Sequence, residues 1–166
     1  MGAVDKAAII DGSTIAAGDH IYALPSSGCH SNGYSLIRKI LNNTALKNEP
    51  NIIDTLLEPT TIYVKAISDL KNKYPIKGIA NITGGGLAEN LQRILPTSVS
   101  AHIAKEKIKV PSIFNLLQKY GNVDEQEMYR VFNMGVGMIV ISEADINDHD
   151  CYRIGTIKKG NHEVIL

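Results

Sequence analysis

The order of hydrophobic and polar residues predicts a strand, a polar turn and a helix near the start of the chain. A short apolar run covers His20–Leu24, and small polar residues crowd the stretch that follows it, Pro25–Leu36. Over Tyr34–Leu41, apolar residues recur at helical spacing and therefore share one face. We expect Ser31 or Asn32 to cap this helix at its N-terminus.

A second strand, turn and helix follow the same plan. The strand-like run Lys77–Ile82 leads into Thr83–Gly86, and helical spacing then continues over Leu87–Leu95 until Pro96 ends it. In both units, backbone N–H groups are left free where the helix begins, and the helix dipole favours an anion there. Each turn is therefore a candidate site for a phosphate-bearing ligand.

The rest of the pattern predicts one layered domain. Helices are expected at 61–73, 111–120 and 124–129, strands at 98–103, 138–141, 152–157 and 163–166, and a strand or its approach at 4–11. The glycine-rich segment Asn133–Gly137 precedes its strand instead of following it, which argues against a doubly wound parallel sheet. The expected fold is α/β, of the α+β type, with residues 1–166 forming a mixed β-sheet that helices cover.

Composition restricts the classes of function. Of the 166 residues, 44% are hydrophobic and 20% are charged, as in ordinary globular domains. Lysine plus arginine and aspartate plus glutamate both number 17, and this balance argues against a nucleic-acid or anionic-membrane surface. The sequence shows no secretion signal and no apolar run long enough to span a membrane, so we expect a cytoplasmic protein without a membrane partner.

The two cysteines, Cys29 and Cys151, exclude a disulfide scaffold and a structural zinc site, while a single disulfide stays open. Cys29 lies inside the first turn, but no neighbouring residue in the sequence activates it as a nucleophile. We expect no metal site formed by this chain.

Each turn also has an interpretation without a ligand. The run Gly84–Gly86 lacks the spacing of a dinucleotide or phosphate-binding loop, and glycines at a strand end often form a tight turn. His30 can bond neighbouring backbone groups instead of a substrate. The possible anion partners and polar neighbours of the turns are Lys65, Lys77, Arg93, Glu89 and Asn90, although charged side chains on helices are usually solvated.

Three segments, in one order, resemble a known family. They read SSGCHSNGYSLIRKIL at 26–41, GIANITGGGLAENLQRILP at 78–96 and FNMGVGM at 132–138, with support from LLEPTTIYVK at 56–65 and YRIGTI at 152–157. Together they closely resemble phosphoribosylformylglycinamidine cyclo-ligase, also called aminoimidazole ribonucleotide synthetase. The resemblance extends over nearly the whole chain.

The resemblance implies the C-terminal, substrate-side half of a purine-biosynthesis ligase. Members of the family convert formylglycinamidine ribonucleotide and ATP into aminoimidazole ribonucleotide, ADP and phosphate. Their N-terminal half binds most of the ATP and Mg²⁺ and forms most of the dimer contact, and this sequence aligns only with the other half. We therefore expect an inactive isolated domain, a small-molecule ribonucleotide as substrate, and a homodimer for the full-length enzyme.

The resemblance also assigns roles to residues of the three segments. It implies catalytic roles for His30 and Asn32. Substrate or phosphate binding is implied for Ser27, Gly28, Ser31, Gly33, Thr83, Gly84, Gly85, Gly86 and Asn133.

One departure concerns residues 141–150, where the family usually has a helix and this chain has room only for a loop or turn. Two alternatives stay open. The chain could belong to another member of the same ATP-dependent superfamily, similar to selenophosphate synthetase or an amidotransferase synthetase, or it could be a non-catalytic binding module.

Overall fold

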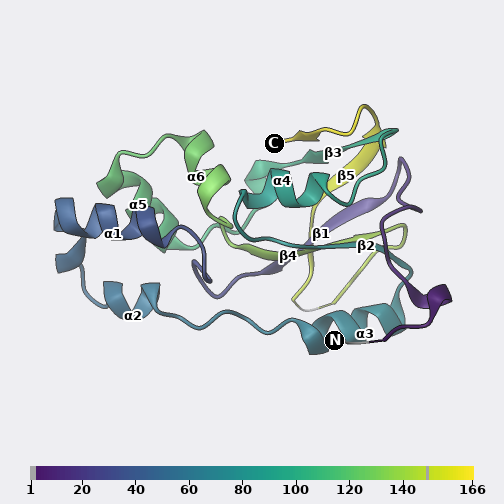
Figure 1. Ribbon diagram of the computed structural model, residues 1–166, viewed down its shortest axis with the longest axis horizontal. Coiled ribbons are helices and arrows are strands. Elements are labelled where there is room, and N and C mark those ends of the chain that lie inside the picture. Colours follow the sequence, from purple (N-terminus) through teal and green to yellow (C-terminus); the bar gives the residue numbers. More distant parts are fainter. Residues whose placement is uncertain (1–2, 149) are drawn as a thin grey trace.

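A six-stranded mixed sheet forms the centre of the protein in the computed structural model, which describes residues 3–148 and 150–166 (Figure 1). The strand order is β2-β4-β1-β5-β3-β6. The strands are β1 (His20–Pro25), β2 (Ile76–Asn81), β3 (Val99–Ile103), β4 (Val136–Ser142), β5 (Tyr152–Lys159) and β6 (Val164–Ile165). Neighbours pair antiparallel except β3 and β6, which are parallel. The predicted mixed sheet with helices is confirmed.

The helices lie on both faces of this sheet and beyond one end of it (Figure 1). They are α1 (Tyr34–Asn43), α2 (Ile52–Leu56), α3 (Val64–Lys73), α4 (Gly86–Gln92), α5 (Ser112–Gly121) and α6 (Glu125–Val131). Three short 3-10 helices, η1 (Lys6–Ala8), η2 (Ala45–Asn48) and η3 (Lys105–Lys107), complete the described elements. In the part of the chain that the structure describes, no helix is both long and apolar enough to cross a membrane.

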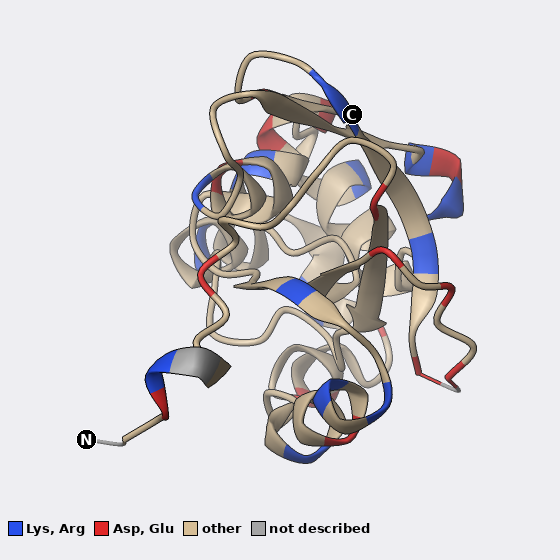
Figure 2. Cartoon of the chain, turned by 90° about the vertical axis from the view of Figure 1, so that its right-hand side faces the viewer, with Lys and Arg blue, Asp and Glu red and all other residues tan. Residues whose placement is uncertain are grey.

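The alternation of side chains along β1 divides the core between the two faces of the sheet. Ile21 and Ala23 pack in one cluster with the apolar face of α4, whereas Tyr22 and Leu24 pack in another with Leu70 of α3. A third cluster joins α1, α2, α5 and α6 beyond the end of the sheet. Acidic and basic residues are interspersed over the surface, consistent with a formal net charge of zero (Figure 2).

Two expectations from the sequence were wrong in detail, and a third was confirmed. Residues 4–11 form no strand but contain η1. The helix expected from Thr61 begins at Val64, and Ile62, which was expected on its packed side, is 83% exposed. The β-branched run Thr60–Ile62 fits the late start, because such residues lose side-chain freedom in a helix and have a lower helix propensity. The loop expected at residues 141–150 follows Ser142, and its described residues contain no helix.

Candidate functional site

The three glycine-containing segments meet at one end of the strands. Because β1 and β2 both run antiparallel to β4, which lies between them, the C-terminal ends of β1 and β2 lie beside the N-terminal end of β4. There the N–H of Ser26 donates to the carbonyl of Gly135 at 2.9 Å, and the N–H of Ile82 donates to that of Gly137 at 3.0 Å. Sheet topology thus joins turns that are more than fifty residues apart in the sequence.

Asn133 fastens the first turn to the segment before β4. Its side chain is buried, and its Oδ1 accepts hydrogen bonds from Ser26 Oγ at 3.0 Å and from the N–H of Gly135 at 2.9 Å. Its Nδ2 donates to the carbonyl of Gly28 at 2.8 Å. Because the oxygen and the nitrogen of its amide are both hydrogen-bonded within the protein, the side chain of Asn133 supports the turn from its buried side and does not reach the surface.

His30 has an unusual backbone conformation and a buried ring within the same turn. Its φ is +53°, its exposed fraction is 7%, and its Nε2 accepts a hydrogen bond from the N–H of Ser27 at 3.3 Å. Burial lowers the pKa of the imidazole because it penalises the charged form. The ring is therefore neutral near pH 7, and with Nε2 accepting, its proton lies on Nδ1.

An extended segment, Pro59–Tyr63, lies against the outer side of the first turn. Ser27 Oγ donates to the carbonyl of Pro59 at 2.6 Å, and Ser31 Oγ lies 3.5 Å from Thr60 Oγ1. Tyr63 Oη donates to the carbonyl of Pro25 at 2.6 Å, at the end of β1. The exposed hydroxyls of the turn are thus oriented by contacts to this segment.

Tyr63 also packs beside His30. The ring centroids of the two residues are 6.1 Å apart, and a Cβ atom at Gly137 would overlap both Tyr63 Oη and the ring of His30. Sequence reasoning missed Tyr63 because it assigned residues 61–73 to a helix. The proline at position 59 and the LLEPTTIYVK motif were the available signals.

The second turn, Thr83–Gly86, is held by one buried side chain. Asn90 Nδ2 donates to the carbonyls of Gly84 at 3.2 Å and Gly86 at 2.7 Å, and it also lies 3.3 Å from the carbonyl of Thr83. Gly84 is exposed, and a Cβ atom there would meet nothing within 4 Å. Gly85 has a φ of +93°, which favours glycine. The solvent-facing part of this turn is therefore Thr83–Gly85.

Two of the predicted binding glycines are required by packing. Gly33 (φ +78°) caps α1, and a Cβ atom there would overlap the ring of Phe132. A Cβ atom at Gly86 (φ +65°) would overlap the carbonyl oxygen of Tyr129. The expected Ser31 or Asn32 cap is therefore wrong, because the left-handed Gly33 occupies the N-cap position without a side-chain hydrogen bond.

The thiol of Cys29 lies beneath the turn and not on its surface. Burial raises its pKa to about 12, so it stays protonated at neutral pH. Cys29 and Cys151 are both free cysteines. A nucleophilic role for Cys29 does not fit this environment.

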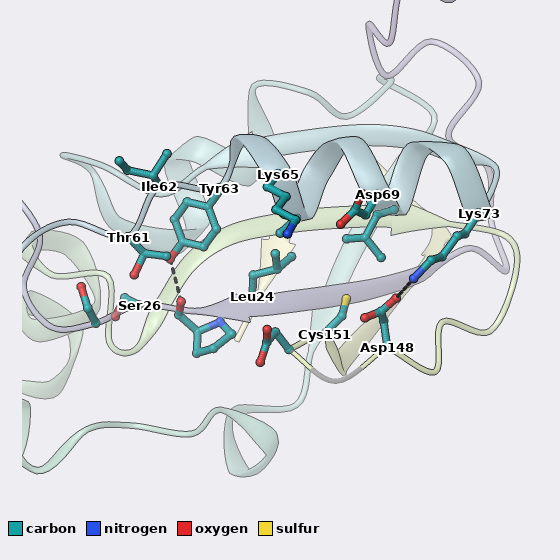
Figure 3. A pocket seen from close by; sticks show the side chains of 15 residues that line it. Leu24, Ser26, Thr61, Ile62, Tyr63, Lys65, Asp69, Lys73, Asp148 and Cys151 are labelled. Atoms are coloured by element: carbon teal, nitrogen blue, oxygen red, sulfur yellow. Dashed lines mark hydrogen bonds and ion pairs between the residues drawn. The ribbon is translucent and has the colours of Figure 1, made fainter.

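The candidate cations differ in their positions. Lys77 lies near the opposite end of β2, where it pairs with Asp19 at 2.9 Å and Glu143 at 2.8 Å, so it does not face the turns. Arg93 Nη1 donates to Asn90 Oδ1 at 3.2 Å and so lies behind the second turn. Lys65 lines a cavity of about 610 Å³ that also includes Ser26 and Ser27 of the first turn (Figure 3).

That cavity extends from the first turn along α3 to the loop before β5 (Figure 3). Lys73 and Asp148 form an ion pair of 3.0 Å near its far end. No group of three or more His, Cys, Asp or Glu side chains arranged to hold a metal ion occurs within residues 3–148 and 150–166.

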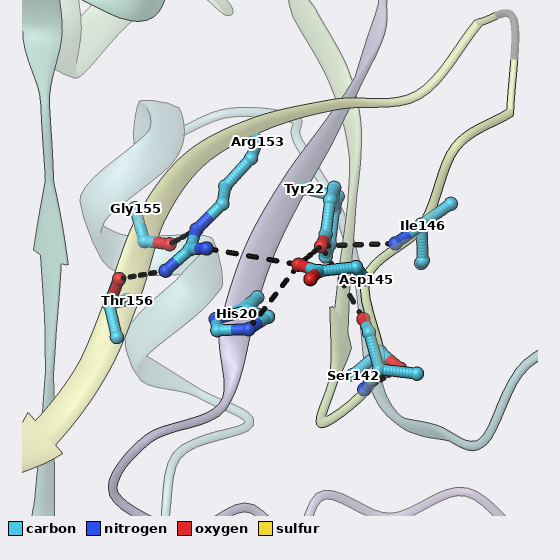
Figure 4. A network of polar contacts seen from close by, with 9 residues as sticks. His20, Tyr22, Ser142, Asp145, Ile146, Arg153, Gly155 and Thr156 are labelled. Atoms are coloured by element: carbon cyan, nitrogen blue, oxygen red, sulfur yellow. Dashed lines mark hydrogen bonds and ion pairs between the residues drawn. The ribbon is translucent and has the colours of Figure 1, made fainter.

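A polar network at the other end of β1 fixes the short loop after β4 (Figure 4). Tyr22 Oη lies 3.3 Å from Asp145 Oδ1 and accepts a hydrogen bond from the N–H of Ile146 at 3.1 Å. His20 Nε2 and Arg153 Nη1 lie 3.5 Å and 3.9 Å from the same carboxylate. Because His20 starts β1 and the turn follows its end, this network is separate from the candidate site.

Comparison with known proteins places the chain in a family. Residues 16–166 match the family described as AIR synthase related protein, C-terminal domain. A phosphoribosylformylglycinamidine cyclo-ligase of Nitrosospira multiformis is 47% identical over 96% of this chain and 49% of its own length. One from Acetivibrio thermocellus is 50% identical over 88% of this chain and 45% of its own length. The chain thus spans about half the length of these relatives.

Two solved structures share the fold at low sequence identity. Thiamine monophosphate kinase of Aquifex aeolicus gives a TM-score of 0.58 at 19% identity and covers 94% of this chain and 51% of its own. E. coli HypE, a hydrogenase maturation protein, gives 0.59 at 14% identity and covers 96% of this chain and 49% of its own. The match over residues 16–166 and the identity to these relatives show that the chain belongs to the family of AIR synthase related protein, C-terminal domain.

Proposed function

We propose that this chain is the C-terminal, substrate-side domain of a phosphoribosylformylglycinamidine cyclo-ligase. The observation that carries the proposal is the hydrogen-bonded junction at Asn133, which unites the first turn with the segment before β4. The names of the relatives that are 47% and 50% identical supply the reaction. The complete enzyme would convert formylglycinamidine ribonucleotide and ATP into aminoimidazole ribonucleotide, ADP and phosphate.

In this reaction the oxygen of the substrate's formyl amide attacks the γ-phosphorus of ATP, and ADP leaves. A substrate nitrogen then attacks the activated carbon, the ring closes, and phosphate leaves with the former amide oxygen. Both steps need reactants held in line and negative charge stabilised where it develops. Backbone N–H groups and glycine turns can do this without steric hindrance.

The residues of the two turns would divide this work. Ser27, Ser31 and Asn32 would hold the substrate from one side, and Thr83, Gly84 and Gly85 would hold it from the other. Gly28, which is bonded to Asn133, and Gly33 and Gly86, which packing requires, would give the turns their shape. His30, neutral and with its proton on Nδ1, would polarise the amide oxygen or relay a proton. Asn133 would keep the first turn in place. Asn32 would contact the reacting end of the substrate.

ATP and Mg²⁺ would be held mainly by the N-terminal half of the complete enzyme. The turns of this chain carry hydroxyls, amides and glycines, and its described residues offer no carboxylate cluster of the kind that Mg²⁺ prefers. The donor set here does not fit a resident Mg²⁺ ion, so we assign none of its chemistry to this domain. The domain alone would bind a ribonucleotide but not cyclise it, and the full-length enzyme would be a homodimer.

A chimera tests the proposal. The N-terminal half of the Nitrosospira relative is joined to this chain, and formation of aminoimidazole ribonucleotide is followed. Asn32→Ala should lower kcat by about a hundredfold or more while the melting temperature changes little. His30→Ala should lower kcat by a similar factor, and because it also removes a buried ring it should lower the melting temperature as well, so its kcat is measured well below that temperature. Asn147→Ala, in the exposed loop after β4, is the matched control and should leave turnover unchanged. Wild-type turnover in both site variants would contradict the assignment.

A second candidate rests on the fold. Thiamine monophosphate kinase and HypE share it, so another ATP-dependent reaction of the same superfamily is the alternative. A screen of the chimera with the substrates of those enzymes separates the two. Turnover of one of them, without cyclisation of formylglycinamidine ribonucleotide, would favour the alternative.

A further inference from the structure

Two apolar side chains where α3 begins are unusually exposed. Ile62 is 83% exposed and Val64 is 77% exposed, more than the other large hydrophobic residues of the described chain. Ile62 projects from the segment that precedes α3 (Figure 3). Single exposed apolar residues are common. Two of them on either side of one buried residue, Tyr63, instead indicate a surface that binds another molecule.

Val64 lines a groove between α3 and β2. Ile62 lines the cavity described above, and Tyr63 lines both. The groove encloses about 560 Å³. Its walls are lined by Thr60, Thr61, Tyr63, Val64, Ile67, Ser68, Lys71, Asn72, Ile79, Asn81 and Met138. Lys71 is the one charged residue among them, so little charge would lose its hydration if the groove were covered.

The groove adjoins both turns of the candidate site. Of its lining residues, Thr60 and Tyr63 contact the first turn through Ser31 and the end of β1. Asn81, which also lines it, is the last residue of β2 and leads into the second turn. β2 is also the edge strand of the sheet. Whatever covers the groove therefore adjoins both turns at once.

We propose that the groove between α3 and β2, together with Ile62 and Val64, is the docking surface for the polypeptide that forms the other half of the longer relatives. This inference rests on the proposed function, and it assigns the partner of the same site. The relatives have about twice the length of this chain, so a second polypeptide unit of similar size accompanies the domain in them. The groove suits a polypeptide better than a phosphorylated substrate, since apolar side chains alternate with uncharged polar ones along its walls and Lys71 is its one cation.

Hydrogen–deuterium exchange on this chain alone and on the chimera tests the surface. Joining the N-terminal half should slow exchange about tenfold or more at the amides of residues 64–68 and 76–81, because docking removes them from water. The amides near Ile165, in the strand at the opposite edge of the sheet from β2, should not change. In the chimera, Ile62→Ser combined with Val64→Ser should restore the fast exchange. Ile165→Ser, which alters a residue that is 45% exposed in β6, is the matched control and should have no effect.

Several outcomes would overturn the inference. One is equal exchange in the chain alone and in the chimera, and another is continued protection in the double variant. A third is that the chain alone sediments as a dimer and the double variant as a monomer, since a second copy of the chain would then cover the groove. Product formation separates the two proposals. Protection without cyclisation would refute only the function, whereas cyclisation without protection would refute only the docking surface.

Discussion

Replacing Asn133 by alanine should destabilise the protein strongly. The change removes three hydrogen bonds at a residue that is 1% exposed. Ser26 is half-buried and can turn to water, whereas the carbonyl of Gly28 and the N–H of Gly135 are buried and would lose their partner. Three bonds at about 1 kcal/mol each, with two backbone groups left unsatisfied, predict a loss of about 3–5 kcal/mol. That is a large fraction of the stability of a typical domain.

Replacing Asn133 by aspartate isolates the contribution of the single donor. Aspartate keeps Oδ1 as an acceptor but, when ionised, places a second oxygen against the carbonyl of Gly28, which now lies 2.8 Å from Nδ2. Burial would raise the pKa of this carboxyl in the folded state above its unfolded value of about 3.9. Between these two pKa values the folded state binds the extra proton, so the free energy of unfolding of the variant should increase as pH falls.

Urea unfolding followed by circular dichroism measures both variants, provided that the slope m stays that of the wild type. Ser26→Ala, which removes only the partly exposed partner, is the control and should cost about 1 kcal/mol. A loss below about 1 kcal/mol for Asn133→Ala would refute the reasoning. So would an Asn133→Asp variant whose deficit relative to the wild type is the same at pH 7 and pH 4.5.

Three further predictions follow from the geometry of the turns. Gly86→Ala should lower the free energy of unfolding by about 2–4 kcal/mol because a Cβ atom would overlap a backbone carbonyl, while Gly84→Ala, in open space, should stay within about 0.5 kcal/mol in the same urea experiment. The pKa of His30 is lowered by burial, so stability should fall as pH drops below about 6.5, and His30→Gln should show a weaker dependence over pH 5–7 in thermal melts. Cys29, whose pKa is raised to about 12, should react with iodoacetamide at pH 7.5 far more slowly in the native protein than in urea, and equal rates would contradict its burial.

The strand–turn–helix units could be predicted because each is encoded locally. Apolar periodicity and a cluster of small residues fixed β1, α1, β2 and α4 to within a few residues. The cap of α1 could not be predicted, since the requirement for Gly33 comes from the ring of Phe132, about a hundred residues away. The contacts of Tyr63 with Pro25 and His30 could not be predicted for a similar reason, because these residues become its neighbours only in the folded protein.

Residue types alone singled out segments that the sheet brings together, but they did not distinguish residues at the surface of a turn from those that support it. Asn133 was expected near the substrate and is instead bonded behind the turn. Gly33 and Gly86 were expected to bind, and their conformations are already explained by packing. Such distinctions depend on which side of a turn faces solvent, which periodicity does not encode.

The position of β4 has a consequence for how the protein acquires its site during synthesis. β4 lies between β1 and β2 in the sheet although it follows both in the chain, and no direct pairing holds β1 to β2. Both turns therefore emerge from the ribosome long before the strand that aligns them, and their closing contacts include one of Ser26 with Asn133, 107 residues later in the sequence. A nascent or prematurely terminated chain that stops before residue 136 would contain every residue of both turns and yet have no aligned site. Competence to bind would thus arise late, together with completion of the sheet.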